Sequence, residues 1–240
     1  MGLMNISGLN ALIEALREGQ PLNRIWIGST RRGPKIDLIK SLCRRQGVVF
    51  QIVPDEAIRR KAGMKNQGVF AEVSPVPFRP LEKILEINRR GLIVLLDGIE
   101  DVGNLGAIIR TAAAVEADAV VVAARRSAPL TETVWQTSAG AVAKIPIVQS
   151  ANLVREIERL KKAGFWVYGT AAEAGTIYWE CDFTVPTAFI FGSEQRGLSP
   201  LLKKKADGLL RIPIAAAVES LNVAAAAAAV LFEARRQKLA

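Results

Sequence analysis

The sequence contains no histidine and only two cysteines. Without histidine, imidazole acid–base catalysis, a Ser-His-Asp triad and metal binding through histidine are all excluded. Cys43 and Cys181 lie far apart and neither belongs to a CxxC pair, which argues against a structural zinc site or a disulfide framework. No metal is therefore expected. Any catalysis must use Asp, Glu, Lys, Arg, Ser, Asn or backbone groups.

Long apolar runs are also missing. No run reaches the roughly 18–20 residues that cross a bilayer, and the longest, Val223 to Phe232, is mostly alanine and predicts a buried helix. The first eight residues lack the charged-then-apolar pattern of a signal peptide. Half of the 240 residues are apolar, enough for a sizeable core. We therefore expect a soluble, cytoplasmic protein with no membrane partner.

The positive charge is unevenly distributed. The net charge is +9, and residues 1–75 hold 12 Lys and Arg against 6 Asp and Glu, whereas residues 92–240 hold 16 against 15. A basic module joined to a nearly neutral one indicates that the first module meets a polyanion. The alternative is an ordinary solvated basic surface, and charge alone does not separate the two.

The first 75 residues read as a compact α/β unit. Apolar residues at helical spacing, alternating runs and glycine turns give its elements. The expected helices are 8–19, 36–45 and 54–61, the strands are 22–27, 48–53 and 68–73, and a basic loop covers 31–35. Three prolines between Ser74 and Pro80 then predict a stiff, extended connector. We place a linker at 76–90 and a second domain at 91–240.

The second part alternates short apolar strands with helices. The expected strands are 92–96, 119–122, 145–148, 165–168, 188–191 and 209–212, and the expected helices include 105–115, 151–162 and 221–238. Such alternation predicts an α/β fold with a mostly parallel sheet covered on both faces.

Three polar loops follow strands of this sheet, where ligands of open parallel sheets bind. They cover residues 97–106, 192–198 and 213–223. The first is glycine-rich and could hold a phosphate or dinucleotide, but it lacks both GxGxxG and GxxxxGK[ST]. A single loop of this kind could be simple turn geometry, whereas three on one sheet predict an α/β enzyme with a ligand crevice.

The same loops carry a family resemblance. The segment 104–112 (NLGAIIRTA) looks like the first motif of the SpoU (TrmH-like) RNA methyltransferases of the SPOUT superfamily. The segment 191–194 (FGSE) resembles the second motif, and 212–214 (IPI) with 220–226 (SLNVAAA) resembles the third. Residues 1–75 are similar to the accessory RNA-binding domain, akin to ribosomal proteins, of the two-domain RlmB-like branch. Asn66-Gln67-Gly68 falls where that branch commonly has His-Gln-Gly.

The resemblance implies a C-terminal trefoil-knotted methyltransferase domain that works as a homodimer with S-adenosylmethionine as cofactor. Backbone groups near Thr170, Gly192, Ile212 and Leu221 would hold the cofactor. The implied activity is 2′-O-methylation of a ribose in ribosomal RNA, a guanosine of the large subunit. A transfer-RNA methylase and an antibiotic-resistance ribosomal methylase remain alternatives, as does a non-catalytic RNA-binding protein.

The resemblance also implies roles for individual side chains. Arg110 would clamp a phosphate or lower the pKa of the ribose hydroxyl through its charge, since arginine effectively never loses its proton. Asn104 would contact the loop or the ribose, or simply cap the helix that follows. Glu194 would orient Arg110 or accept the proton through water; otherwise it stabilises a turn.

Ser220 and Asn222 would position Arg110 or the substrate, or cap the last helix. The sequence departs from the family pattern at Gln195, at Ala224 and in the run 215–217. These departures leave an inactive relative among the alternatives.

Overall fold

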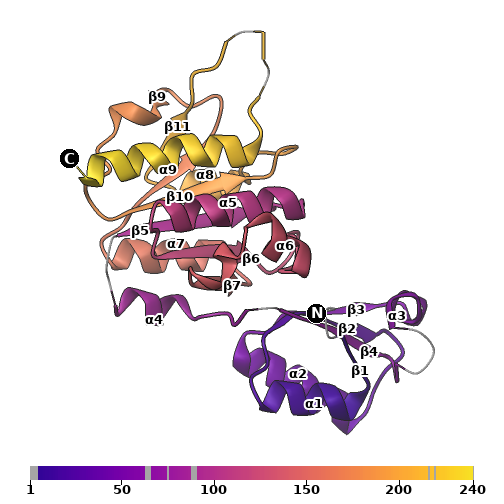
Figure 1. Ribbon diagram of the computed structural model, residues 1–240. Helices are drawn as coiled ribbons and strands as arrows, with labels where there is room; N and C mark the ends of the chain where they lie inside the picture. Colours follow the sequence, from indigo (N-terminus) through magenta and orange to yellow (C-terminus); the bar gives the residue numbers. More distant parts are fainter. Residues whose placement is uncertain are drawn as a thin grey trace. The chain divides into compact units, whose positions relative to one another are not determined.

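The computed structural model (Figure 1) describes residues 5–62, 66–74, 76–87, 91–215, 217–218 and 220–239. The chain forms two compact units. The smaller unit comprises residues 1–77 with 129–132, and the larger comprises 78–128 with 133–240. Residues 88–90, at the end of the expected linker, and Ala216 and Glu219, in the third expected loop, lie outside the described residues.

The smaller unit is a mixed four-stranded sheet with helices on both faces. Its strands lie in the order β1-β4-β2-β3, and of the pairs in this sheet β2–β3 is parallel while β1–β4 and β2–β4 are antiparallel. Its elements are β1 (Asn5–Ser7), α1 (Leu9–Arg17), β2 (Leu22–Gly28), α2 (Pro34–Gln46), β3 (Phe50–Val53), α3 (Asp55–Ala62) and β4 (Val69–Val73). The sequence predicts each of these except β1, whose three residues are too few to show alternation.

Two apolar clusters hold this unit together. On one face, α1 and α2 pack on the sheet through residues such as Leu12, Leu16 and Ile39, which are fully buried. On the other face, Ile58 of α3 packs against Trp26 and Phe70. The residues of β2 therefore alternate between two buried layers, as a covered strand requires.

The segment expected to be a linker contains structure of its own. Phe78 forms a parallel bridge to Ile147, and helix α4 (Leu81–Leu85) follows. Leu81 and Ile84 are buried in the core of the larger unit. The three prolines dominate the local sequence pattern and conceal these two apolar positions, whose spacing of three is helical.

The larger unit is built on a seven-stranded sheet in which every described pair is parallel. The strand order is β7-β6-β5-β10-β8-β11-β9. The strands are β5 (Leu92–Asp97), β6 (Ala119–Ala123), β7 (Ile147–Ser150), β8 (Trp166–Thr170), β9 (Thr176–Ile177), β10 (Thr187–Gly192) and β11 (Gly208–Arg211). This confirms the predicted α/β class with a parallel sheet, while a knot stays a prediction. The two-residue strand β9 was not predicted.

Helices cover both faces of this sheet. They are α5 (Val102–Ala114), α6 (Glu132–Thr137), α7 (Leu153–Lys162), α8 (Pro200–Lys205) and α9 (Val223–Leu239), with 3-10 turns η1 (Ala141–Ala143) and η2 (Tyr178–Glu180). One face packs against α4, α7 and α8. Helices α5 and α9 lie side by side (Figure 1) and contact β6 and β10 respectively. No helix of the described residues is long and apolar enough to cross a membrane.

The sheet reverses its winding between β5 and β10. From β5 the chain moves outward to β6 and β7, whereas β8 and β11 lie on the far side of β10. Such a switch point leaves a crevice at the carboxyl ends of the two strands, because their loops turn in opposite directions. The loops at 97–106 and 192–198 both start there.

Polar side chains anchor the C-terminal end of α9. Gln237 accepts a hydrogen bond from the backbone N–H of Phe183 and donates to Cys181 O and to Glu233. Hydrogen bonds from Arg236 and Gln237 lower the pKa of Glu233 to about 2. Because this pKa is depressed in the folded state, the stabilisation is present above the unfolded-state pKa and disappears as the pH falls through the folded-state value.

We predict that Glu233→Gln removes this acid-dependent contribution. The melting temperature of the wild type should exceed that of Glu233→Gln at neutral pH, and the difference should shrink as the pH falls from about 4.3 toward about 2. Thermal unfolding followed by circular dichroism across this range would check it. A difference that does not change with pH would show that the carboxylate does not anchor α9.

Candidate active site

The crevice between β5 and β10 is shaped by close backbone approaches. Asp97, the last residue of β5, accepts a hydrogen bond from the backbone N–H of Ser199 at 3.0 Å. A Cβ atom on Gly192 would lie 2.2 Å from the carbonyl carbon of Gly197. Only glycine therefore lets the loop after β10 fold back on its own strand.

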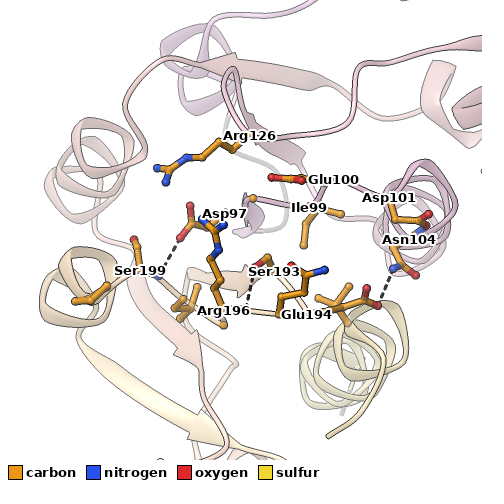
Figure 2. Close-up of a pocket in the computed structure, with 16 residues that line it drawn as sticks. Asp97, Ile99, Glu100, Asp101, Asn104, Arg126, Ser193, Glu194, Arg196 and Ser199 are labelled. Atoms are coloured by element: carbon orange, nitrogen blue, oxygen red, sulfur yellow. Dashed lines mark hydrogen bonds between the residues drawn. The ribbon is translucent and has the colours of Figure 1, made fainter.

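Three of the predicted catalytic residues meet in this crevice. The side-chain amide of Asn104 donates to Glu194 Oε1 at 2.7 Å (Figure 2). The amide of Asn222 donates to the same Glu194 oxygen at 2.7 Å and to Asn104 Oδ1 at 2.9 Å. These residues come from α5, from the loop after β10 and from the start of α9. The fold thus assembles one hydrogen-bonded cluster from segments 90 and 28 residues apart in the chain.

The expected helix caps are partly wrong. Asp101 caps α5, because its side chain accepts a hydrogen bond from the backbone N–H of Asn104 at 2.7 Å. Asn104 lies in the first turn, which leaves its side chain available to Glu194. Asn222 does cap its helix, since its Oδ1 accepts from the N–H groups of Ala224 and Ala225 at 2.9 and 3.3 Å.

Arg110 does not join this cluster. It is exposed on α5, six residues after Asn104, and so points about 120° away around the helix axis, since successive residues rotate by roughly 100°. Within the described part of the chain it has no hydrogen-bond or ion-pair partner. Whatever Arg110 binds must therefore come from outside the described residues of a single chain.

A cavity of about 340 Å³ opens beside the cluster, and we call it the β8/β11 cavity. It collects all four of the residues expected to hold the cofactor, together with Glu194 and Ser220. Apolar side chains from β11 and the loop after it complete the lining. The lining thus includes Thr170 at the end of β8, Gly192 at the end of β10, and Leu210, Ile212, Ile214 and Leu221 from β11 and the loop after it.

A second cavity of about 370 Å³, the β5/β10 cavity, lies over the loop after β5. Its lining includes Asp97, Glu100, Arg126, Glu194 and Arg196 (Figure 2). Arg126 was not among the predicted site residues, and its place just after an expected strand is the sequence signal that points to it. No group of three or more His, Cys, Asp or Glu that could hold a metal ion occurs among the described residues.

A parallel sheet with a crevice at its switch point and a polar cluster inside that crevice defines an α/β enzyme. Comparison with known families specifies which one. Residues 91–232 match the SpoU rRNA Methylase family, and residues 6–79 match the family described as RNA 2′-O ribose methyltransferase substrate binding. The chain belongs to the SpoU family and is an RNA methyltransferase that uses S-adenosylmethionine.

Related proteins agree with this assignment. A protein of Staphylococcus haemolyticus assigned to the TrmH family of tRNA/rRNA methyltransferases is 36% identical over 237 residues, which covers 97% of this chain and 95% of that protein. YacO of Bacillus subtilis, with the same assignment, is 35% identical over 97% of this chain and 95% of its own length.

Solved structures give the same result. The SpoU methyltransferase AviRb of Streptomyces viridochromogenes, crystallised with the cofactor AdoMet, is 27% identical with a TM-score of 0.63, over 99% of this chain and 91% of that one. An rRNA methyltransferase of Sinorhizobium meliloti is 30% identical with a TM-score of 0.63, over 98% and 88% of the two chains. The predicted family and cofactor are therefore confirmed.

Asn222 has two functions that substitutions can separate. Asn222→Ala removes both the cap of α9 and the bonds to Glu194 and Asn104, whereas Asn222→Ser keeps a capping oxygen and loses only those bonds. We expect Asn222→Ala to lower the free energy of unfolding by about 1 kcal/mol and Asn222→Ser by less than about half of that. Both should lose methyl transfer to a similar extent. Denaturant unfolding and a transfer assay check this, and equal destabilisation by the two variants would assign stability to the cluster instead of the cap.

Proposed function

We propose that this protein methylates a ribose 2′-hydroxyl of ribosomal RNA, with a guanosine of the large subunit as the acceptor. The observation that carries the proposal is the position of Glu194. It is held by two amide groups, and it lines both the β8/β11 cavity and the β5/β10 cavity. A carboxylate shared by two adjoining cavities is suitably placed between a methyl donor in one and an acceptor in the other.

The β8/β11 cavity fits the cofactor. Leu210, Ile212, Ile214 and Leu221 offer apolar surface for a flat base. Backbone groups near Thr170, Gly192, Ile212 and Leu221 would hold the polar edge. When bound there, S-adenosylmethionine supplies an electrophilic methyl group.

Glu194 and Arg110 have separate roles toward the RNA substrate. Glu194 accepts two amide N–H groups through one oxygen, Oε1, so its carboxylate is fixed in orientation and can orient the ribose hydroxyl or take its proton through water. Arg110 keeps its own proton and binds the phosphate beside the acceptor ribose. Ser220, at the edge of the β8/β11 cavity, helps to position the substrate.

Pairing of two copies would complete the site. Helix α9 presents half-buried alanines and Phe232, which is 53% exposed, and it packs beside α5. Helix α5 carries Arg110, which has no partner among the described residues. An exposed aromatic ring beside small side chains suits a close helix contact. We infer a homodimer in which α5 and α9 lie at the interface and bring Arg110 toward the RNA.

The smaller unit would bind the RNA. We propose that residues 1–75 form the substrate-binding domain, 76–90 the connection and 91–240 the methyltransferase domain. The expected basic loop at 31–35 is shorter than predicted, because α2 begins at Pro34; the segment carries Arg31, Arg32 and Lys35 beside a tight turn. In that turn Asn66 accepts a hydrogen bond from the Gly68 N–H, and Gln67 accepts one from the Leu9 N–H. An accessory module of this kind favours ribosomal RNA as the substrate.

Separate incubations of the protein and labelled S-adenosylmethionine with unmodified large-subunit ribosomal RNA and with unmodified transfer RNA test the proposal. Alkali-resistant linkages are then mapped on each RNA. One new 2′-O-methyl guanosine supports it. Label only on transfer RNA makes the protein a transfer-RNA methylase, and a site that confers drug resistance makes it a resistance methylase. Cofactor binding without any transfer would leave an RNA-binding relative.

Arg110→Ala should lower methyl transfer about 100-fold or more, because the phosphate or the developing oxyanion loses a charged partner. Cofactor affinity should stay close to that of the wild type, since Arg110 does not line the β8/β11 cavity. Arg155→Ala, which removes an exposed arginine from α7, is the control. Full turnover by Arg110→Ala would show that the assigned role is wrong.

Charge removal from the basic loop tests the smaller unit. Arg32→Gln and Lys35→Gln should each reduce the slope of log affinity against log salt by about one, because each neutralised phosphate releases its counterion. Lys83→Gln, at an ion pair on α4, is the control. RNA binding measured over a salt series would check this, and identical slopes for all three variants would count against an RNA contact at this loop.

A further inference from the structure

The β5/β10 cavity has no assigned ligand. It adjoins the β8/β11 cavity, and the segment from Ser193 to Leu198, all but Gln195 of which lines both cavities, forms a common wall. At about 370 Å³ it is large enough for one nucleotide, since ligand sites commonly begin at roughly 300 Å³. Its ligand would therefore lie directly across the wall from the cofactor.

The carboxylates and the guanidinium groups that line this cavity differ in whether they have hydrogen-bond partners. Three of its carboxylates already accept hydrogen bonds: Asp97 from Ser199, Asp101 from Asn104, and Glu194 from two amides. The fourth, Glu100, is exposed at the rim. In contrast, the guanidinium groups of Arg126 and Arg196 have no hydrogen-bond or ion-pair partner in the part of the chain that the structure describes. Both side chains are drawn at the cavity in Figure 2.

Arg126 also has an unusual backbone. Its φ of +52° lies in the left-handed region, which a long side chain rarely adopts. The next two residues hold the loop in place, because Ser127 Oγ donates to Ile99 O at 3.3 Å and the Ala128 N–H donates to the same oxygen at 2.7 Å. Backbone strain of this kind persists where neighbouring contacts enforce it, and it concentrates at ligand sites.

We propose that the β5/β10 cavity receives the target nucleotide of the RNA and that Arg126 and Arg196 bind its flanking phosphates. A guanidinium group matches a phosphate through paired N–H donors. With its phosphates held there, the nucleotide reaches the Glu194 cluster from the side opposite the cofactor. Arg126 and Arg196 are thus substrate-binding residues distinct from Arg110. This inference rests on the proposed function, because it assigns the acceptor side of the same site.

The test compares Arg126→Asn and Arg196→Gln with the matched control Arg125→Gln. Arg125 is exposed and adjacent to Arg126 but does not line the cavity. Asparagine tolerates the left-handed backbone, so Arg126→Asn removes the charge without adding strain. The readouts are cofactor affinity, melting temperature, KM and kcat for the transcript that the wild type methylates, and the salt dependence of RNA binding.

Each cavity variant should raise KM for RNA about tenfold, because a hydrogen bond to a charged partner typically contributes that much. Each should also lower the salt slope by about one. The melting temperatures of both variants should match that of Arg125→Gln. Cofactor affinity should match it for Arg126→Asn, because Arg126 does not line the β8/β11 cavity, whereas Arg196 lines both cavities. A purely structural role for either arginine would instead lower the melting temperature and leave the salt slope unchanged.

The inference is overturned if both cavity variants keep the KM and salt slope of Arg125→Gln while the wild type transfers methyl groups normally. A wild type that binds RNA and transfers nothing would sink the proposed function instead. In that case the salt slopes of the cavity variants still decide whether this cavity binds phosphate.

Discussion

The parallel pairing of β5 with β10 is the contact on which the rest of the site depends. Six residue pairs, from Leu92–Thr187 to Asp97–Gly192, align the two strands so that both end at the same edge of the sheet. This alignment brings Asn104 within hydrogen-bond distance of Glu194, and the return of the chain into α9 adds Asn222. The fully buried Val94, Leu95, Phe189 and Ile190 hold the alignment in place. Core packing and site geometry therefore have the same origin.

The sequence predicts those features that arise from local patterning. Apolar runs such as 92–96 and 188–191 are buried strands because both faces of a parallel sheet are covered. Patterning fails where an element is very short, as in β9, or where a stronger local signal hides it, as the prolines hide α4. The cap of α5 was misplaced for a related reason. Asp101 and Asn104 are both of residue types that cap helices. The hydrogen bond from the Asn104 N–H to the Asp101 side chain identifies Asp101 as the cap, and this bond is seen only in the folded structure.

The candidate site likewise contains residues that the sequence predicts and residues that it does not predict. The family motifs, which occur in order along the chain, predict that Asn104, Glu194 and Asn222 are site residues. The fold brings these three together. The motifs say nothing of Arg126, which belongs to no motif and is noticeable only through its backbone and its place in a cavity. Nor do they predict that Arg110 projects away from the cluster, since this follows from the helical rotation between residues 104 and 110.

The wall between the two cavities has a thermodynamic consequence. Gly192 and Gly197 approach each other closely and close the segment between them into a tight loop, and residues of this loop line both cavities. A ligand that shifted this loop in one cavity would change the shape of the other, and the two binding free energies would then be coupled. Coupling of this kind is reciprocal: the factor by which the cofactor alters RNA affinity equals the factor by which RNA alters cofactor affinity. A shared loop of this kind would favour paired occupancy of the two cavities without any site dedicated to regulation.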